Sequence, residues 1–378
     1  MPVTSCDIFC KVIDNYGDIG VCWRLARQLA GEHGLAVRLW VDDLASFQRL
    51  APPIDPAQPE QTLAGVCVRH WDDSAAQARP ADIVIEAFAC DPPDAYVAAM
   101  AAQPRKPAWI NLEYLSAEDW VEGSHALPSP HPRLPLTKYF FFPGFTRRTG
   151  GLLCEAAPLA ALQAFQADTS AQRAFWQRVA GEALLEPVLK VSLFAYENTA
   201  VGSLLDAWAR GPHAVVCVVP AGRILPQVDA WQGAQRDCGA LRLIRLPFLA
   251  QADYDTLLAA CDLNFVRGED SFVRTQWLAR PFVWHIYPQA DNAHQPKLAA
   301  FLQRYTAGLS PAAARALTDL WLAWNAGESL ATPWPALHAA LPELRQHAAA
   351  WAQILVENGD LAAKLLIFCK DLLECPAS

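Results

Sequence analysis

The sequence predicts an α/β protein of two consecutive doubly wound domains, and three observations carry this prediction. Short apolar runs rich in Val, Ile and Phe alternate with stretches of helical periodicity, as is typical of parallel βαβ units. This alternation restarts after Pro187, so a second series of elements follows the first. The chain has 378 residues, 53% of them hydrophobic and 18% charged, which exceeds one ordinary core and predicts two domains.

The first series occupies residues 1–184. An apolar run at residues 7–13, a helical pattern over 19–32 and a second apolar run at 36–41 together form a βαβ unit. The later elements of this domain are predicted strands at 66–69, 83–87, 109–112 and 140–142, and predicted helices at 159–165 and 171–184.

The second series occupies residues 185–359 and begins with a predicted strand at 188–194, a helix at 199–209 and a strand at 214–219. The later elements are predicted strands at 241–246, 263–266 and 282–286, and predicted helices at 253–260 and 271–279. From Pro311 the pattern is helical, with interruptions expected at Pro333 and Pro335.

Composition excludes several classes of function. A formal net charge of −9 disfavours nucleic-acid binding, which needs clustered Lys and Arg. We find neither a membrane-spanning apolar run nor a secretory signal pattern, so we expect a cytoplasmic protein without a membrane partner. The eleven cysteines and nine histidines show no zinc-type spacing, so no metal and no cofactor are expected.

A first polar cluster follows the first predicted strand and contains Asp14, Asn15, Tyr16, Gly17 and Asp18. Glycine lets the backbone approach a ligand closely, whereas two carboxylates would repel a phosphate. The cluster therefore favours a cationic or hydroxylic acceptor. Structural roles stay open, because Asp18 could be a helix N-cap and Asp14 an ordinary turn residue.

A second polar cluster lies between a predicted strand and helix and contains Arg267, Gly268, Glu269, Asp270 and Ser271. The helix N-terminus and the guanidinium suit a diphosphate, and Ser271 could cap the helix or donate to an oxygen. The two acids are expected to serve hydroxyls or a cationic acceptor. A capped helix with an internal Arg–carboxylate pair is the alternative.

A third, dispersed set could hold a nucleobase. Tyr196 follows the predicted strand at 188–194, and Phe248 and Gln251 follow the strand at 241–246, with Leu249 and Ala250 between them. Aromatic rings can stack on a base, and a glutamine can bond its Watson–Crick edge. Taken singly, each of these aromatic residues favours a packing role over base binding. Together, on the same edge as the Arg267 cluster, they favour a base pocket.

Seven segments resemble the bacterial protein-arginine rhamnosyltransferases of elongation factor P, the EarP family. They are residues 9–20 (FCKVIDNYGDIG), 23–26 (WRLA), 111–118 (NLEYLSAE), 150–152 (GGL), 247–248 (PF), 267–274 (RGEDSFVR) and 284–289 (WHIYPQ). The first and sixth of these are long enough to be specific.

The resemblance implies the GT-B architecture, in which two Rossmann-like domains face each other across a cleft. It implies that the helix within residues 360–378 packs on the first domain. The implied reaction is an inverting, metal-independent transfer of rhamnose from dTDP-β-L-rhamnose to an arginine guanidine of elongation factor P. Asp18 then matches the general base, Asp14 a second essential acid and Glu269 a residue with a catalytic role.

The same resemblance assigns the remaining positions to substrate binding. Tyr196 and the segment 248–251 match the thymidine pocket, and residues 267–271 match the diphosphate and sugar contacts. Two other functions remain open at this point: a nucleotide-sugar 2-epimerase, which needs no protein acceptor, and a non-catalytic two-lobed ligand-binding protein.

Overall fold

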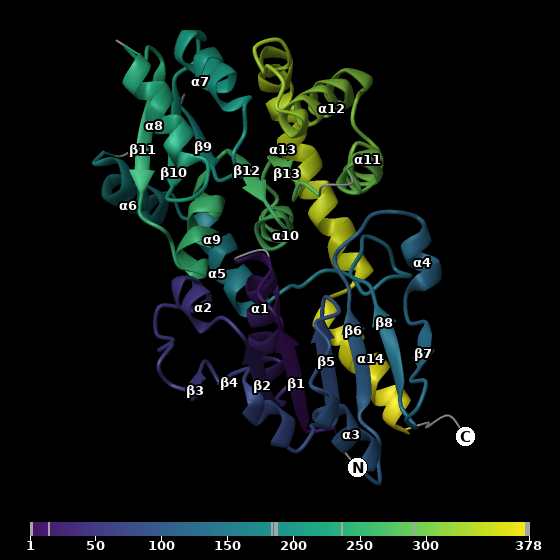
Figure 1. Cartoon of the computed structure of the whole chain (residues 1–378). Helices are drawn as coiled ribbons and strands as arrows, with labels where there is room; N and C mark the ends of the chain where they lie inside the picture. The colour runs from purple at the N-terminus through teal and green to yellow at the C-terminus, as the bar shows by residue number, and fades with distance from the viewer. Residues whose placement is uncertain are drawn as a thin grey trace. The chain divides into compact units, whose positions relative to one another are not determined.

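The structure is a computed structural model that describes residues 3–13, 16–182, 184, 188–235, 237–289 and 292–374. It divides into two compact units. Unit 1 comprises Met1–Glu155 and Leu355–Ser378, and unit 2 comprises Ala156–Ile354. Each unit has its own sheet and its own helices (Figure 1).

Within the described residues, unit 1 contains an eight-stranded sheet in the order β3-β4-β2-β1-β5-β6-β8-β7. The strands are β1 (Ser5–Cys10), β2 (Ala36–Val41), β3 (Glu60–Leu63), β4 (Val66–His70), β5 (Ile83–Ala87), β6 (Ala108–Leu112), β7 (Pro128–Pro130) and β8 (Thr137–Phe141). The pairings are parallel except at the two edges, where β3 and β7 run antiparallel to their neighbours.

Helices cover both faces of this sheet. They are α1 (Gly17–Gly31), α2 (Leu44–Leu50), α3 (Asp94–Ala102), α4 (Trp120–Ser124) and α14 (Leu361–Glu374), with a 3₁₀ turn η1 at Asp73–Gln77. Side chains of α1 and α14 share one apolar core with β1, β2 and β6, and α14 lies along β6 in Figure 1. A second core around Trp40, Tyr96 and Trp109 covers the other face. Because β1 and β5 are buried on both faces, most of their residues are apolar, and Asp7 and Glu86 are buried charged exceptions.

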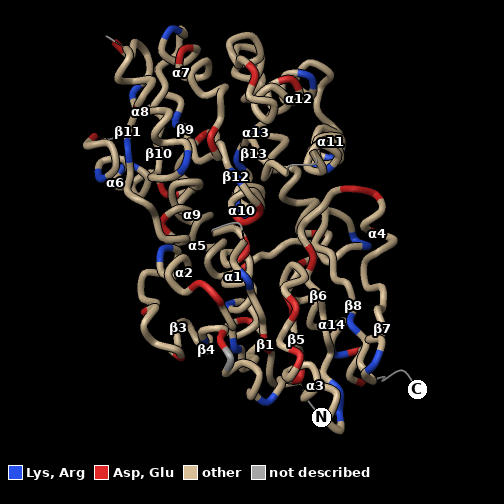
Figure 2. Tube along the Cα trace, in the orientation of Figure 1, with Lys and Arg blue, Asp and Glu red and all other residues tan. Residues whose placement is uncertain are grey.

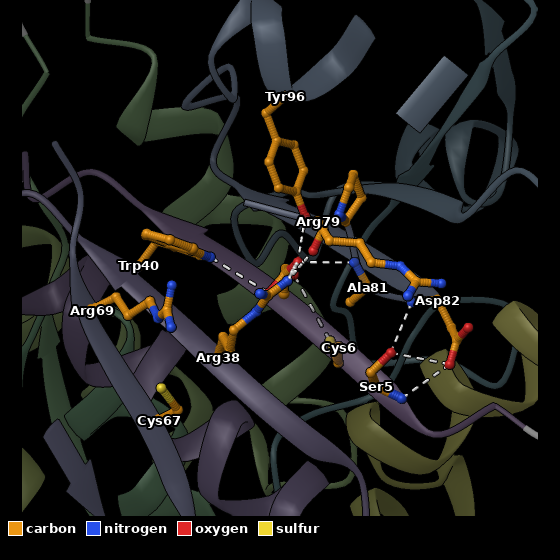
Figure 3. Close-up of polar contacts among 12 residues, drawn as sticks. Ser5, Cys6, Arg38, Trp40, Cys67, Arg69, Arg79, Ala81, Asp82 and Tyr96 are labelled. Carbon is orange, nitrogen blue, oxygen red and sulfur yellow. Dashed lines mark hydrogen bonds and ion pairs between the residues drawn. The ribbon is translucent and has the colours of Figure 1, made fainter. Parts of the chain in front are cut away.

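One carboxylate lies inside the second core. Asp7 of β1 is fully buried and receives Nε and Nη2 of Arg38 at 2.5 and 2.6 Å, the Ala81 amide at 3.0 Å and the Tyr96 hydroxyl (Figure 3). Burial, then the charge of Asp7, raises the pKa of Tyr96 well above its ordinary value, so the phenol stays a donor. Several donors thus compensate the desolvation of one buried charge.

Unit 2 contains, among the described residues, a parallel sheet in the order β11-β10-β9-β12-β13. Its strands are β9 (Leu189–Leu193), β10 (Val215–Pro220), β11 (Leu241–Leu246), β12 (Leu263–Arg267) and β13 (Phe282–His285). Its helices are α5 (Ala156–Ala167), α6 (Thr169–Ala180), α7 (Val201–Arg210), α8 (Leu225–Ala234), α9 (Gln251–Ala260), α10 (Asp270–Trp277), α11 (His294–Tyr305), α12 (Pro311–Ala326) and most of α13 (Pro333–Asn358). The last residues of α13, from Leu355, belong to unit 1.

The division differs from the predicted one at residue 184. Helices α5 and α6 belong to unit 2, because Phe175 and Trp176 of α6 pack with Val216, Val218 and Leu257. Pro333 and Pro335 start α13 rather than interrupt a helix, since proline is well tolerated in a first helical turn. Helix α14 packs in unit 1, where the resemblance places it.

Among the helices of the described residues, none combines the length and the apolar character that a membrane crossing demands.

Candidate active-site clusters in the two units

Strand order locates a ligand site in each unit. In unit 1 the order β4-β2-β1-β5-β6 reverses direction between β1 and β5, and in unit 2 the order β11-β10-β9-β12-β13 reverses between β9 and β12. In open parallel sheets, ligands bind beyond the carboxyl ends of the strands at this reversal. The first polar cluster follows β1, and the second follows β12. Both predicted clusters therefore stand at a reversal point.

In unit 1, Asp18 lies in the first turn of α1 and is 2% exposed. Its Oδ2 accepts the Ile13 amide at 2.9 Å, and its Oδ1 accepts the hydroxyl of Tyr114 at 3.1 Å. The sequence allowed Asp18 to be the N-cap, but Tyr16 holds that position and Gly17 begins the helix. Asp18 thus points back toward the end of β1 rather than capping its own helix. Asp14 and Asn15 lie outside the described residues.

The negative charge of Asp18 affects the pKa of the Cys10 thiol, at the end of β1. Its pKa is raised well above the ordinary value by a hydrogen bond with Cys22, by burial, and by the negative charges of Asp18 and Asp42. Cys10 therefore stays protonated and does not supply a second anion beside the Asp18 carboxylate.

In unit 2, Arg267 ends β12 and is 8% exposed. Its guanidinium carbon lies 4.7 Å from the ring centre of Phe194 and 4.6 Å from that of Tyr196. Among the described residues this guanidinium meets no carboxylate within ion-pair distance, and its buried Nε has no hydrogen-bond partner. Cation–π contacts contribute about 0.5–2 kcal/mol, less than the several kcal/mol that burying an ion costs. An anionic ligand would supply the missing compensation.

His285, at the end of β13, belongs to the same neighbourhood. Its ring centre is 5.3 Å from that of Tyr196, and its pKa is lowered to about 4 by burial, then by the positive charges of Arg267 and His294. His285 is therefore neutral at pH 7. Arg267 therefore lies beside a neutral imidazole rather than beside a second cation at His285.

The rest of the second cluster folds as a tight turn into α10. Gly268 has φ of 60°, a left-handed conformation that a side chain would strain, and its carbonyl accepts the indole N–H of Trp284 at 2.8 Å. The N-cap of α10 is Glu269, which makes no side-chain capping bond. Ser271 is not the cap: its hydroxyl donates to the Arg267 carbonyl at 2.6 Å, so its proton is already committed.

Asp270, the first residue of α10, makes a side-chain contact with α9. Its carboxylate accepts the side-chain amide of Gln251, the first residue of α9, at 2.9 Å. The Gln251 amide nitrogen, predicted to bond the edge of a base, is therefore engaged within the protein.

The predicted base-binding residues divide into two groups. Phe248, Leu249 and Ala250 form the partly exposed link between β11 and α9, at the carboxyl edge of the sheet. Tyr196 follows β9 and is buried against Arg267, His285 and Tyr287. The sheet thus brings Tyr196, after β9, next to Arg267, at the end of the neighbouring β12. Phe248 lies at the same edge of the sheet but follows β11, two strands from β9.

Sequence reasoning assigned no site role to three side chains at these edges. Phe194 covers Arg267 and packs against Tyr254, and His285 completes the neighbourhood. Tyr114 reaches Asp18 from the segment after β6. In each case the available signal was a polar or aromatic residue directly after a buried strand, a pattern that packing residues also produce.

Within the part of the chain that the structure describes, no group of three or more His, Cys, Asp or Glu side chains is arranged to hold a metal ion.

This chain is similar to known proteins along nearly its whole length. The family model for the elongation factor P (EF-P) rhamnosyltransferase EarP matches residues 6–370. A protein-arginine rhamnosyltransferase of Pseudomonas putida is 52% identical over 374 residues, covering 97% of this chain and 99% of its own.

Solved structures are also similar to this chain. One describing the structural basis of EarP-mediated arginine glycosylation of translation elongation factor EF-P shares 38% identity and a TM-score of 0.68, covering 97% of this chain and 99% of its own. A putative UDP-N-acetylglucosamine 2-epimerase from Listeria monocytogenes, at 12% identity, 99% and 97% coverage and a TM-score of 0.50, shows likeness of fold alone. The fold class is α/β of the GT-B type, as predicted, and the chain belongs to the EarP family of EF-P rhamnosyltransferases.

Proposed function

We propose that this protein transfers rhamnose from dTDP-β-L-rhamnose to an arginine guanidine of elongation factor P, with inversion and without a metal. The observation that supports it most is the buried Arg267 guanidinium, which lies between two aromatic rings and lacks an anion among the described residues. A nucleoside diphosphate supplies both the anion that this cation needs and the planar base that suits an aromatic edge. Family membership supports the sugar and the acceptor.

The reaction is a single displacement. A guanidine nitrogen of the acceptor attacks the anomeric carbon of rhamnose, a C–N bond forms, and the bond from that carbon to the dTDP oxygen breaks. The guanidinium is a poor nucleophile because its pKa is above about 12, so a base must take one proton. We assign this proton to Asp18, whose carboxylate is held by two donors.

The other predicted residues have supporting roles in this proposal. Asp14 and Glu269 are the second and third carboxylates that orient the acceptor or the sugar. Arg267 and the backbone amides at the start of α10 stabilise the negative charge that the departing dTDP gains. Gly268 lets the chain come close to the diphosphate, because a side chain at its φ would be strained.

The direct test is a mass measurement. We expect that purified protein incubated with dTDP-β-L-rhamnose and elongation factor P adds one deoxyhexose to an arginine-containing peptide of the acceptor and releases dTDP. An unchanged peptide mass, with calorimetry showing that the donor is bound, would contradict the proposal. Conversion of the donor without any acceptor would favour the epimerase instead. A translation factor as acceptor also supports a cytoplasmic location, which fractionation would test.

Donor affinity should depend on Arg267 and Phe248. Arg267→Ala removes charge-assisted hydrogen bonds worth about 1.5–3 kcal/mol, and Phe248→Ala removes base stacking worth about 1–3 kcal/mol. We therefore expect dTDP to bind roughly tenfold to a hundredfold more weakly to each variant in calorimetry.

A matched control for this experiment is Arg245→Ala. Arg245 is a partly exposed unit 2 arginine whose Nε lies 2.6 Å from Asp229. Its removal should leave dTDP affinity unchanged. Wild-type affinity in both the Arg267 and Phe248 variants would show that the phosphate and base assignments are wrong.

A further inference from the structure

The segment after β5 carries unusual backbone geometry. Phe88, Ala89 and Asp91 have φ angles of 58°, 55° and 49°, a left-handed region that non-glycine residues rarely occupy. Such conformations cost free energy and persist only where surrounding contacts enforce them, often at functional sites. This segment follows β5, one of the two strands at the reversal point of unit 1.

Hydrogen bonds hold the strained segment in place. The Phe88 amide donates to the Leu112 carbonyl at 2.7 Å, and the Ala89 amide donates to the side-chain oxygen of Asn111 at 3.0 Å. Leu112 and Asn111 end β6, so the segment is fixed to the strand that leads into Tyr114. The backbone geometry thus sets where the Phe88 ring lies.

The Phe88 ring in turn supports Tyr114. The two rings stack with centres 4.2 Å apart and an angle of 13° between their planes. Phe88 is 9% exposed and Tyr114 is 39% exposed, so a buried ring supports a more exposed one. From this position the Tyr114 hydroxyl donates to Oδ1 of Asp18 at 3.1 Å.

Asp18 is consequently held from two sides. The Ile13 amide binds Oδ2 from the end of the β1 segment, and the Tyr114 phenol binds Oδ1 from the segment after β6. The Ile13 donor is a backbone amide that every substitution except proline retains, whereas Tyr114→Phe removes the phenol donor. Of the two donors to Asp18, Tyr114 is therefore the one whose hydrogen bond a conservative substitution can remove.

We propose that Tyr114 is a positioning residue for the known family reaction: supported by Phe88, its hydroxyl orients the Asp18 carboxylate toward the acceptor guanidine and stabilises its charged form. This inference rests on the proposed role of Asp18 as the base. A hydrogen bond donated to a carboxylate favours the ionised form over the acid. Losing it should leave the carboxylate both less well oriented and protonated at a higher pH.

The test is Tyr114→Phe, which keeps the ring stack and removes only the hydroxyl. We expect kcat to fall about tenfold, as for the loss of one hydrogen bond to a charged group, with KM for dTDP-rhamnose unchanged. The acidic limb of the pH profile of kcat/KM should move to higher pH by roughly one unit. Cys10, the other titratable neighbour described above, remains protonated in both proteins.

The matched control is Tyr139→Phe. Tyr139 is a half-buried tyrosine of β8 in the same unit, and its ring packs against Phe368 rather than Asp18. It should keep wild-type kcat and an unshifted pH profile. A thermal unfolding midpoint for both variants checks that loss of activity is not loss of folding.

Two outcomes separate this inference from the proposed function. If Asp18→Asn is inactive while Tyr114→Phe keeps the wild-type kcat, or loses activity without any shift of the acidic limb, the positioning role is overturned and Asp18 remains the base. If Asp18→Asn itself turns over normally, the proposed role of Asp18 as the base is wrong.

Phe88→Leu keeps the Tyr114 hydroxyl but removes the stacked ring. It should reproduce part of the shift in the pH profile that Tyr114→Phe causes. A wild-type pH profile in Phe88→Leu would count against the support role of Phe88.

Discussion

Asp18→Asn should lower the rate of rhamnosyl transfer by roughly 10²–10⁴, the range that a positioned general base contributes. The amide has nearly the shape of the carboxylate and can still accept one hydrogen bond, but it cannot take a proton from the guanidinium. Because Asp18 belongs to unit 1 and the Arg267 site to unit 2, dTDP affinity should stay at the wild-type value. Steady-state kinetics and calorimetry measure the two quantities.

Asp42→Asn is the matched control for that variant. The Asp42 carboxylate accepts the Val12 amide at 2.9 Å, much as Asp18 accepts the Ile13 amide, and an asparagine oxygen can replace it. We expect this control to keep most of the wild-type turnover. Near-normal turnover in Asp18→Asn would remove Asp18 from the mechanism.

Asp7→Asn should destabilise unit 1 by about 3–5 kcal/mol, since breaking a buried ion pair leaves its partner without compensation. Asp7 is fully buried, and Arg38 binds it through Nε and Nη2 with a side chain that is only 25% exposed. The amide would also turn two hydrogens toward the donors Tyr96 and Ala81. Figure 3 shows how these groups converge. Urea denaturation followed by tryptophan fluorescence measures the change.

A surface pair of the same unit gives the comparison. The Glu60 carboxylate lies 2.5 Å from Arg69, but Glu60 is 56% exposed, so Glu60→Gln should cost less than about 1 kcal/mol. Equal effects from the two substitutions would mean that the Asp7 cluster does not stabilise the pairing of β1 with β2. Asp7 lies apart from the Asp18 cluster, so residual folded protein should retain its kcat.

The apolar patterns predicted most of the strands because parallel strands buried on both faces are continuous apolar runs. Strands β5 and β11 have the predicted bounds, and the polar clusters follow β1 and β12 as expected. Figure 2 shows Lys and Arg interspersed with Asp and Glu along the trace of each unit. Periodicity and charge together therefore located the clusters before any contact was known.

The sequence patterns could not predict tertiary contacts. Helices α5 and α6 are apolar on one face, and only the packing of Phe175 and Trp176 in the unit 2 core decides that they belong there. Ser271 precedes a helical pattern as a cap would, yet its place one residue inside α10 lets the hydroxyl reach the Arg267 carbonyl. In unit 1 the N-cap of α1 is likewise two residues before the predicted candidate, at Tyr16 rather than Asp18.

The stacking of Phe88 on Tyr114 is the clearest example of a contact that the sequence alone does not predict. No propensity rule predicts left-handed backbone at Phe88 and Ala89, because the strain is enforced by bonds to Asn111 and Leu112, more than twenty residues away. Charge and aromaticity could nominate Tyr114, but only the fold places its hydroxyl on Asp18.

The stereochemistry and attachment atom of the product test the central proposal most directly. The glycopeptide formed from dTDP-β-L-rhamnose and elongation factor P would be purified, and its anomeric carbon examined by NMR through the one-bond carbon–hydrogen coupling. A single displacement at which Asp18 accepts the proton predicts an α-linked rhamnose on a guanidine nitrogen of arginine. A β-linked product, or a sugar on any other side chain, would contradict it.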